Sequence, residues 1–161
     1  MHIEKFSDYL RNERNFSKKT VLSYVTDLNQ FFAFFNYKIS VFNSSDIRKW
    51  IVFLKDSELE ATSINRKISS LRSYFKLSKR EGWVSENPTL KIKFLGVKKR
   101  LPSFFSENVM KDLFSKIKFS NDFIGTRDNL ILEMFYQTGM RVSELVNLKT
   151  DQIDINSKTL I

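Results

Sequence analysis

The chain has no cysteine and only one histidine, His2, among its 161 residues. Without cysteine there is no disulfide and no thiolate metal site, and one histidine at a terminus argues against a histidine-based metal site. No apolar run approaches the roughly 20 residues of a membrane span, and the residues after Met1 lack the apolar stretch of a signal peptide. We therefore expect a soluble, cytoplasmic protein without a bound metal.

What the chain does contain is apolar and aromatic side chains in abundance. Hydrophobic residues make up 42% of the sequence and aromatic residues 14%, with 16 phenylalanines. This composition is ample for packed cores and argues against a disordered chain. The length fits one average domain or two small ones.

Positive charge is concentrated in the first part of the chain. Residues 1–100 carry 20 Lys and Arg against 10 Asp and Glu, a net charge of +10, whereas residues 101–161 carry 7 against 8, a net charge of −1. A strongly basic segment joined to a near-neutral one indicates that the first part meets a polyanion. Nucleic acid is the leading candidate, and an anionic membrane surface is the alternative.

The first 86 residues predict four amphipathic helices, because apolar residues recur three and four positions apart. Ser17 is placed to cap the second helix, the stretch from Asn43 to Ser45 offers a cap for the third, and Gly82 is placed to end the fourth. The expected core-facing residues, in chain order, are Ile3, Phe6, Leu10, Val21, Val25, Leu28, Phe32, Phe35, Ile47, Trp50, Ile51, Leu54, Ile64, Ile68, Leu71 and Phe75.

The fourth helix carries the clearest candidate binding face, since no acidic residue occurs from Ala61 to Arg80. Small hydroxyl side chains allow close approach to a nucleic-acid backbone, and long cations reach phosphates or base edges. The alternative is an ordinary solvated face. Opposite the apolar stripe lie Thr62, Arg66, Ser69, Ser70, Ser73, Lys76 and Arg80, with Leu77 as the one apolar residue.

The second helix shows a weaker version of this face. Lys19, Ser23, Thr26 and Gln30 lie on its polar side, with Lys18 at the edge. Asp27 dilutes the positive charge. Taken alone, this face reads as ordinary surface.

A linker between two domains is expected at residues 87–102, because Asn87-Pro88 interrupts helical structure and no sustained period follows. The expected domains are therefore residues 1–86 and 103–161. Lys98, Lys99 and Arg100 could hold a phosphate backbone as the chain passes between domains, or could simply keep an ordinary linker soluble.

The last 60 residues predict three helices and the start of a strand. Ser106 can cap the first helix, Thr138-Gly139 stops the second near residue 137, and the third covers about 143–148. The strand that follows has no partner, so we expect an unpaired edge. Between the second and third helices lies Arg141, which can be aimed at a phosphate or can form an ion pair at the helix junction.

The segment Thr138-Gly139-Met140-Arg141-Val142-Ser143-Glu144-Leu145 resembles the first catalytic motif of tyrosine recombinases, the phage-integrase superfamily. The order of segments along the chain resembles the bacterial Xer recombinases. The stretch from Phe16 to Leu28 is similar to the opening of that family's core-binding domain, and Ser63 to Phe75 to its last helix. Asn87-Pro88 and Lys99-Arg100-Leu101-Pro102 resemble the boundary between its domains.

This resemblance implies a mainly α fold, with a four-helix, SAM-like core-binding domain followed by the helical start of a catalytic domain that is truncated at its first β-strand. It implies a C-shaped clamp on duplex DNA and four protomers on two recombination sites, with a second Xer-type recombinase as a candidate partner. A tyrosine of such enzymes forms a 3′-phosphotyrosyl link that a 5′-hydroxyl resolves. No cofactor, metal or membrane is implied.

Arg141 matches the first catalytic arginine of the family, and Glu144 matches a supporting acidic position. The hairpin lysine, His-x-x-Arg motif and nucleophilic tyrosine have no counterpart up to Ile161, so the resemblance implies that these 161 residues alone do not cleave DNA. A non-catalytic competitor for recombination sites and a basic membrane or protein-interaction module remain as alternatives. The expected DNA contacts are Lys18, Lys19, Thr20, Ser23, Tyr24, Thr62, Asn65, Arg66, Ser69, Ser70, Arg72, Ser73, Lys76, Arg80, Lys98, Lys99 and Arg100.

Overall fold

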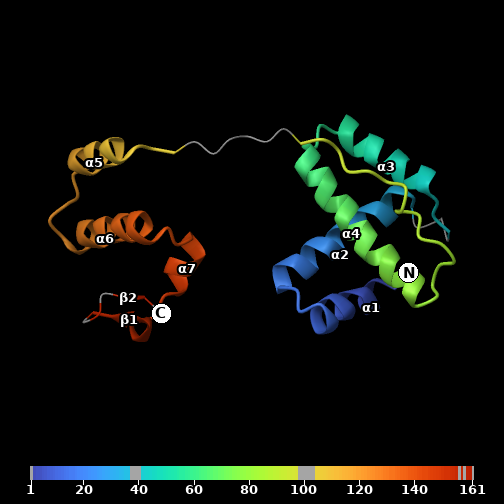
Figure 1. The fold of residues 1–161 in the computed structure, drawn as a ribbon, viewed down its shortest axis with the longest axis horizontal. Helices are drawn as coiled ribbons and strands as arrows, with labels where there is room; N and C mark the ends of the chain where they lie inside the picture. The colour runs from blue at the N-terminus through green and yellow to red at the C-terminus, as the bar shows by residue number, and fades with distance from the viewer. Residues whose placement is uncertain (1, 37–40, 98–103, 156, 158, 161) are drawn as a thin grey trace. The chain divides into compact units, whose positions relative to one another are not determined.

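The computed structural model describes residues 2–36, 41–97, 104–155, 157 and 159–160. The chain divides into two compact units, Met1–Arg100 and Leu101–Ile161, which are drawn in Figure 1. Within the described ranges, no helix combines the length and the apolar character needed to cross a membrane.

The first unit contains the four expected helices. They are α1 (Ile3–Asp8), which continues into the π-helical turn η1 (Tyr9–Glu13), α2 (Lys18–Phe34), α3 (Ser44–Asp56) and α4 (Ala61–Arg80) (Figure 1). The predicted caps are confirmed, because Ser17 Oγ accepts the N–H of Thr20 at 3.2 Å and Asn43 Oδ1 accepts the N–H of Ser45 at 2.8 Å. Gly82 follows α4 with a φ of +70°, a conformation that glycine adopts without strain.

Phe31 lies at the centre of an aromatic core between α2, α3 and α4. Its ring centroid is 4.8 Å from that of Phe42 and 5.1 Å from that of Trp50. Most of the residues that we expected in the core are buried, and Phe31 is a buried residue that we did not expect there. Leu77 was expected on the polar face and is instead buried, because α1 and η1 pack against that end of α4.

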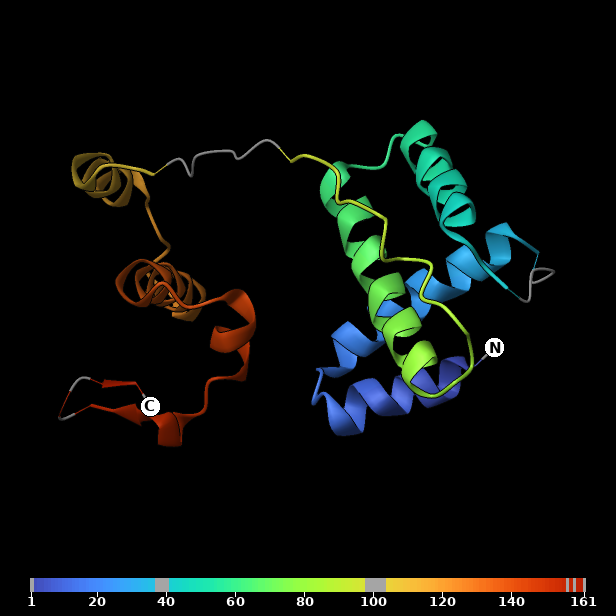
Figure 2. The same cartoon turned by 45° about the vertical axis from the view of Figure 1, so that its right-hand side comes forward.

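The segment after α4 turns back and runs along that helix, as Figures 1 and 2 show. Thr89 and Ile92 are buried, and Ser44 Oγ of α3 donates to the carbonyl oxygen of Pro88 at 2.8 Å. Within the range where we expected the linker, Ile92 is buried and Leu95 is partly buried against the core of the helical unit. Burial of these two apolar side chains is favourable because it removes them from water.

The second unit has the three expected helices and a small hairpin. Its elements are α5 (Glu107–Lys116), α6 (Phe123–Thr138), α7 (Val142–Asn147), the 3₁₀ turn η2 (Thr150–Gln152), β1 (Ile153–Asp154) and β2 (Thr159–Leu160). The unpaired strand edge that we expected is wrong. The chain pairs with itself, with Ile153 opposite Leu160 and Asp154 opposite Thr159 in antiparallel register.

Apolar side chains of the second unit are much more exposed than those of the first. Among the described residues of α5, α6 and α7, only Gly125 is buried. Leu130 on α6 is 59% exposed, and Phe104 is 90% exposed. Tertiary burial therefore stabilises the second unit less than the first.

Candidate nucleic-acid interface

One continuous stripe of polar side chains follows the exposed side of α4. Its members recur three or four positions apart, which places them on one face of the helix. Lys76 is exposed and, among the residues that the structure describes, has no ion pair or side-chain hydrogen bond. Its ammonium group is therefore available to an anion. We call this surface the α4 stripe, and it consists of Thr62, Arg66, Ser69, Ser73, Lys76 and Arg80.

Three residues of α4 that the sequence placed in the DNA contact are used inside the protein. Ser70 is fully buried and donates to Asp27 Oδ2 at 2.7 Å. Asn65 Nδ2 donates to the carbonyl oxygen of Leu95 at 2.9 Å, and its Oδ1 accepts the N–H of Leu95 at 2.8 Å. The guanidinium of Arg72 donates to the carbonyl oxygen of Ile92. Burial of Ser70 and the internal hydrogen bonds of Asn65 and Arg72 leave these side chains less available to DNA than the exposed cations of the stripe, and their DNA contacts stay predictions.

A buried acid from α2 balances the acid-free helix α4. The carboxylate of Asp27 is 1% exposed and accepts hydrogen bonds from Lys67 Nζ at 3.0 Å, from Ser70 and from the guanidinium of Arg66. Lys67 is 7% exposed and lies 6.0 Å from the ring centroid of Trp50. Two cations therefore share one carboxylate, which leaves the cluster with a positive charge.

The sequence offered a signal for this buried cluster. Asp27 precedes the buried Leu28 and lies one turn before Phe31, and Lys67 lies beside Ile64 and Ile68 at the edge of the apolar stripe. A charged residue at the edge of each of two apolar stripes, with opposite signs, predicts a buried pair. We had instead placed Asp27 on the polar surface of α2.

The exposed N-terminal half of α2 supplies two more free cations. Lys18 and Lys19 are exposed, while Ser23 Oγ donates to the carbonyl oxygen of Lys19 at 2.9 Å. Thr20 belongs to the Ser17 cap, and Tyr24 is half-buried with an edge-to-face ring contact. The Asp27 cluster joins α2 to α4, so the exposed sides of both helices belong to one rigid pair.

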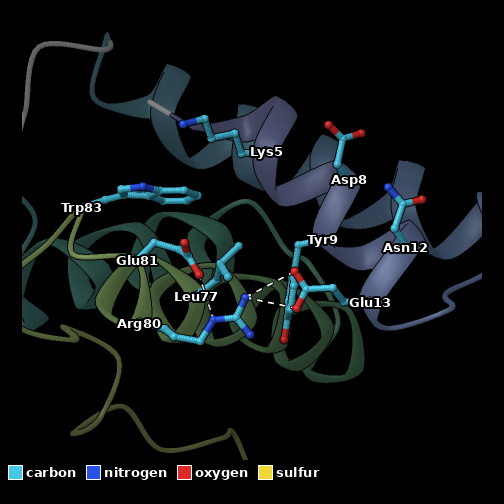
Figure 3. A pocket seen from close by; sticks show the side chains of 9 residues that line it. All are labelled: Lys5, Asp8, Tyr9, Asn12, Glu13, Leu77, Arg80, Glu81 and Trp83. Atoms are coloured by element: carbon cyan, nitrogen blue, oxygen red, sulfur yellow. Dashed lines mark hydrogen bonds and ion pairs between the residues drawn. The ribbon is translucent and has the colours of Figure 1, made fainter.

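Arg80, at the C-terminal end of the stripe, is tied to acids and an aromatic ring. It lies in a surface hollow of about 250 Å³, where it contacts Glu13 at 3.2 Å, Glu81 at 2.9 Å and the ring of Tyr9 at 4.9 Å (Figure 3). The hydrogen bond to Glu81, followed by the hydrogen bond and charge of Glu13, raises the pKa of Arg80. Arg80 is therefore a weaker candidate for a DNA phosphate than Lys76.

In the second unit, the backbone between α6 and α7 fixes the position of Arg141. Gly139 has a φ of +65°, and its N–H donates to the carbonyl oxygen of Phe135 at 2.9 Å, which ends α6. Thr138 Oγ1 accepts the N–H of Met140 at 3.2 Å. The glycine lets the chain reverse direction after α6 without strain. Arg141 then lies immediately before the first residue of α7.

Glu144 holds both the backbone and the side chain of Arg141. Its Oε2 accepts the N–H of Arg141 at 2.7 Å, and its Oε1 accepts Nη1 of Arg141 at 2.8 Å. The Arg141 side chain is 82% exposed, so its other guanidinium donors face solvent. The hydrogen bond from the Arg141 backbone, and then that from its side chain, lowers the pKa of Glu144.

We expect the Glu144 contacts to be lost in acid. A carboxyl group with a lowered pKa in the folded state stabilises that state above its ordinary pKa, and this contribution disappears as the pH falls from the ordinary value through the lowered folded value. Carboxyl-carbon NMR titration measures the pKa directly. Arg141→Met should move the Glu144 pKa back toward its ordinary value, and a pKa that is not lowered in the unaltered chain would contradict the geometry.

The last three predicted DNA contacts, Lys98, Lys99 and Arg100, lie outside the described residues. The α4 stripe and Arg141 belong to different units.

Comparison with protein families matches both units in order. A model described as "Phage integrase, N-terminal SAM-like domain" matches residues 3–82, and one described as "Phage integrase family" matches residues 103–161. The tyrosine recombinase XerC of Staphylococcus carnosus is 40% identical over 162 residues, covering 96% of this chain and 53% of that protein. XerC of Listeria innocua is 34% identical, covering 98% of this chain and 54% of that protein.

Solved structures share the fold at low sequence identity. The Tn1549 transposon integrase, in complex with circular intermediate DNA, has a TM-score of 0.69 and 17% identity over 99% of this chain and 52% of that chain. The integrase from mycobacterium phage Brujita has a TM-score of 0.56 and 16% identity over 98% of this chain and 52% of that chain. The chain spans about half the length of the curated relatives it matches. With its SAM-like helical unit and the Arg141 motif in the second unit, the chain belongs to the phage integrase family of tyrosine recombinases and resembles its Xer-type members.

Proposed function

We propose that the first unit binds duplex DNA through the α4 stripe and the N-terminal half of α2. The observation that carries this proposal is the arrangement of free cations around small hydroxyls on one helical pair. Lys19 and Lys76 are exposed, and Arg66 keeps 46% of its side chain exposed while it is held by Asp27. Ser69 and Ser73 leave room for a phosphate backbone between the long side chains.

The charge distribution supports the same ligand. Residues 1–100 carry a net charge of +10. Cations that approach the phosphates of a duplex release its condensed counterions, which favours association at low ionic strength. We include Lys98, Lys99 and Arg100 in the proposed DNA contact because they continue the basic segment.

For the second unit, we propose that Arg141 contacts the scissile phosphate of a recombination site. Guanidinium groups stabilise the negative charge that gathers on non-bridging oxygens during phosphoryl transfer. Glu144 holds Nη1 of Arg141 and leaves the other guanidinium donors facing solvent. In this role the carboxylate orients the arginine and does not transfer a proton. The parent activity would be cleavage and rejoining of DNA through a 3′-phosphotyrosyl link, in a tetramer on two sites.

A binding titration tests the DNA proposal. Fluorescence anisotropy with a labelled duplex should show binding that weakens steeply between 50 and 200 mM salt, with a log–log slope of about −4 or steeper if five or more phosphates are contacted. Vesicles with anionic lipid, at matched salt, serve as the competing ligand. Tighter binding to the vesicles than to the duplex would overturn the proposal in favour of a membrane-surface role.

A further inference from the structure

The Asp27 cluster places a buried acid beneath the proposed DNA surface. Asp27 Oδ2 receives the Arg66 guanidinium and Ser70 Oγ, while Oδ1 receives Lys67 Nζ. Lys67 Nζ also donates to Gln30 Oε1 of α2. Both oxygens of the carboxylate are therefore engaged by donors from α4.

The three charged groups differ in the exposed fraction of their side chains. Asp27 is 1% exposed and Lys67 is 7% exposed, whereas 46% of the Arg66 side chain is exposed. The carboxylate thus does not come into contact with a bound polyanion, and only the arginine reaches solvent. Because one donor of the guanidinium is held from below, the remaining donors keep a fixed direction on the α4 stripe.

We infer that Asp27 is a positioning residue for DNA binding, which fixes the Arg66 guanidinium on the α4 stripe before the phosphate arrives. This inference rests on the proposed DNA-binding function. A free arginine loses side-chain freedom when it binds a phosphate, and a guanidinium already held by a carboxylate loses less. The acid therefore favours binding of a polyanion by acting through its neighbour.

A positioning role for Asp27 predicts a change in duplex affinity opposite in sign to the change expected from charge alone. Asp27→Asn removes a negative charge near the DNA surface, so electrostatics alone predicts tighter binding. Loss of positioning predicts the reverse, with duplex affinity lowered by about five- to tenfold, because a charged hydrogen bond that orders Arg66 is lost. Asp46→Asn on α3 is the matched control, since Asp46 is also a largely buried acid and does not contact α4 stripe residues.

A double-mutant cycle shows whether Asp27 acts through Arg66. In an Arg66→Ala background, Asp27→Asn should cost no further duplex affinity, whereas in a Lys76→Ala background it should cost its full five- to tenfold, as uncoupled sites do. Anisotropy titrations of the 161-residue chain give the affinities, and stoichiometric titration gives the active fraction of each variant. A merely structural role for Asp27 would reduce affinity equally in both backgrounds.

Ser70→Ala provides a second route if Asp27→Asn folds poorly. It removes one hydrogen bond to Asp27 Oδ2 and leaves every charge in place. We expect about a two- to threefold loss of duplex affinity that disappears in the Arg66→Ala background. If the unaltered chain does not bind duplex DNA, the proposed function fails. A different result would remove only the positioning role. In that case the unaltered chain binds duplex DNA and Lys76→Ala weakens binding, but Asp27→Asn and Ser70→Ala either leave the affinity unchanged or lower it by the same factor with and without Arg66→Ala.

Discussion

Replacing Lys19, Arg66 and Lys76 together with alanine is expected to lower the affinity for duplex DNA by about 10²- to 10³-fold. Each side chain reaches solvent from the exposed side of α2 or α4. A hydrogen bond from a cation to a phosphate contributes about 1 to 1.5 kcal/mol at an exposed site, so three such contacts account for the expected range. The loss should affect all duplex sequences, because phosphate contacts do not read bases.

Salt dependence provides the sharper measurement of this variant. Each phosphate contact that is lost reduces the log–log slope of affinity against salt by about 0.9, so the triple variant should bind with a slope shallower by nearly three. Anisotropy titrations between 50 and 200 mM salt measure both quantities. An unchanged slope would show that these three cations do not meet phosphates.

The matched control removes the same charge from another helix. Arg48, Lys49 and Lys55 lie exposed on α3, outside the α4 stripe and the polar side of α2. Their triple replacement by alanine lowers net charge equally, and we expect less than a tenfold loss through the long-range field alone. Equal losses in the two triple variants would mean that total charge, and not the proposed surface, governs DNA binding.

Helices and their ends could be predicted from the sequence because their causes are local. Ser17 and Asn43 accept backbone N–H groups from residues two or three positions away, and Gly139 ends α6 through its own backbone conformation. Such interactions depend on neighbours within one turn. The Arg141–Glu144 pair belongs to the same class, since three residues separate its members.

Interactions between distant segments were the ones that the sequence did not predict. Asp27 meets Lys67 across 40 positions, and Asn65 meets Leu95 across 30. Asn65 was assigned to DNA and Asp27 to the polar surface of α2, whereas another part of the chain already engages each side chain. Helical period shows which face a residue occupies, but it does not show what covers that face.

Replacing Asp27 with alanine should also have the largest effect on stability, about 3 to 5 kcal/mol lost from the free energy of unfolding of the first unit. The variant removes the only carboxylate within ion-pair distance of Lys67 among the described residues, and the lysine is 7% exposed. Arg66 can turn to solvent, but Lys67 keeps only Gln30 and the ring of Trp50. Burial of an uncompensated charge is what makes the loss large.

Both tryptophans of the chain, Trp50 and Trp83, lie in the first unit, so urea unfolding followed by tryptophan fluorescence reports on that unit alone. Lys67→Met is the informative comparison, because it leaves Asp27 paired with Arg66 and Ser70 and should cost less than Asp27→Ala. Adding Lys67→Met to Asp27→Ala removes the stranded charge, so the double variant should be more stable than Asp27→Ala alone. If the stability losses of the two single variants simply add, then Lys67 becomes solvated when Asp27 is absent. In that case the charge balance of the cluster does not hold α2 and α4 together.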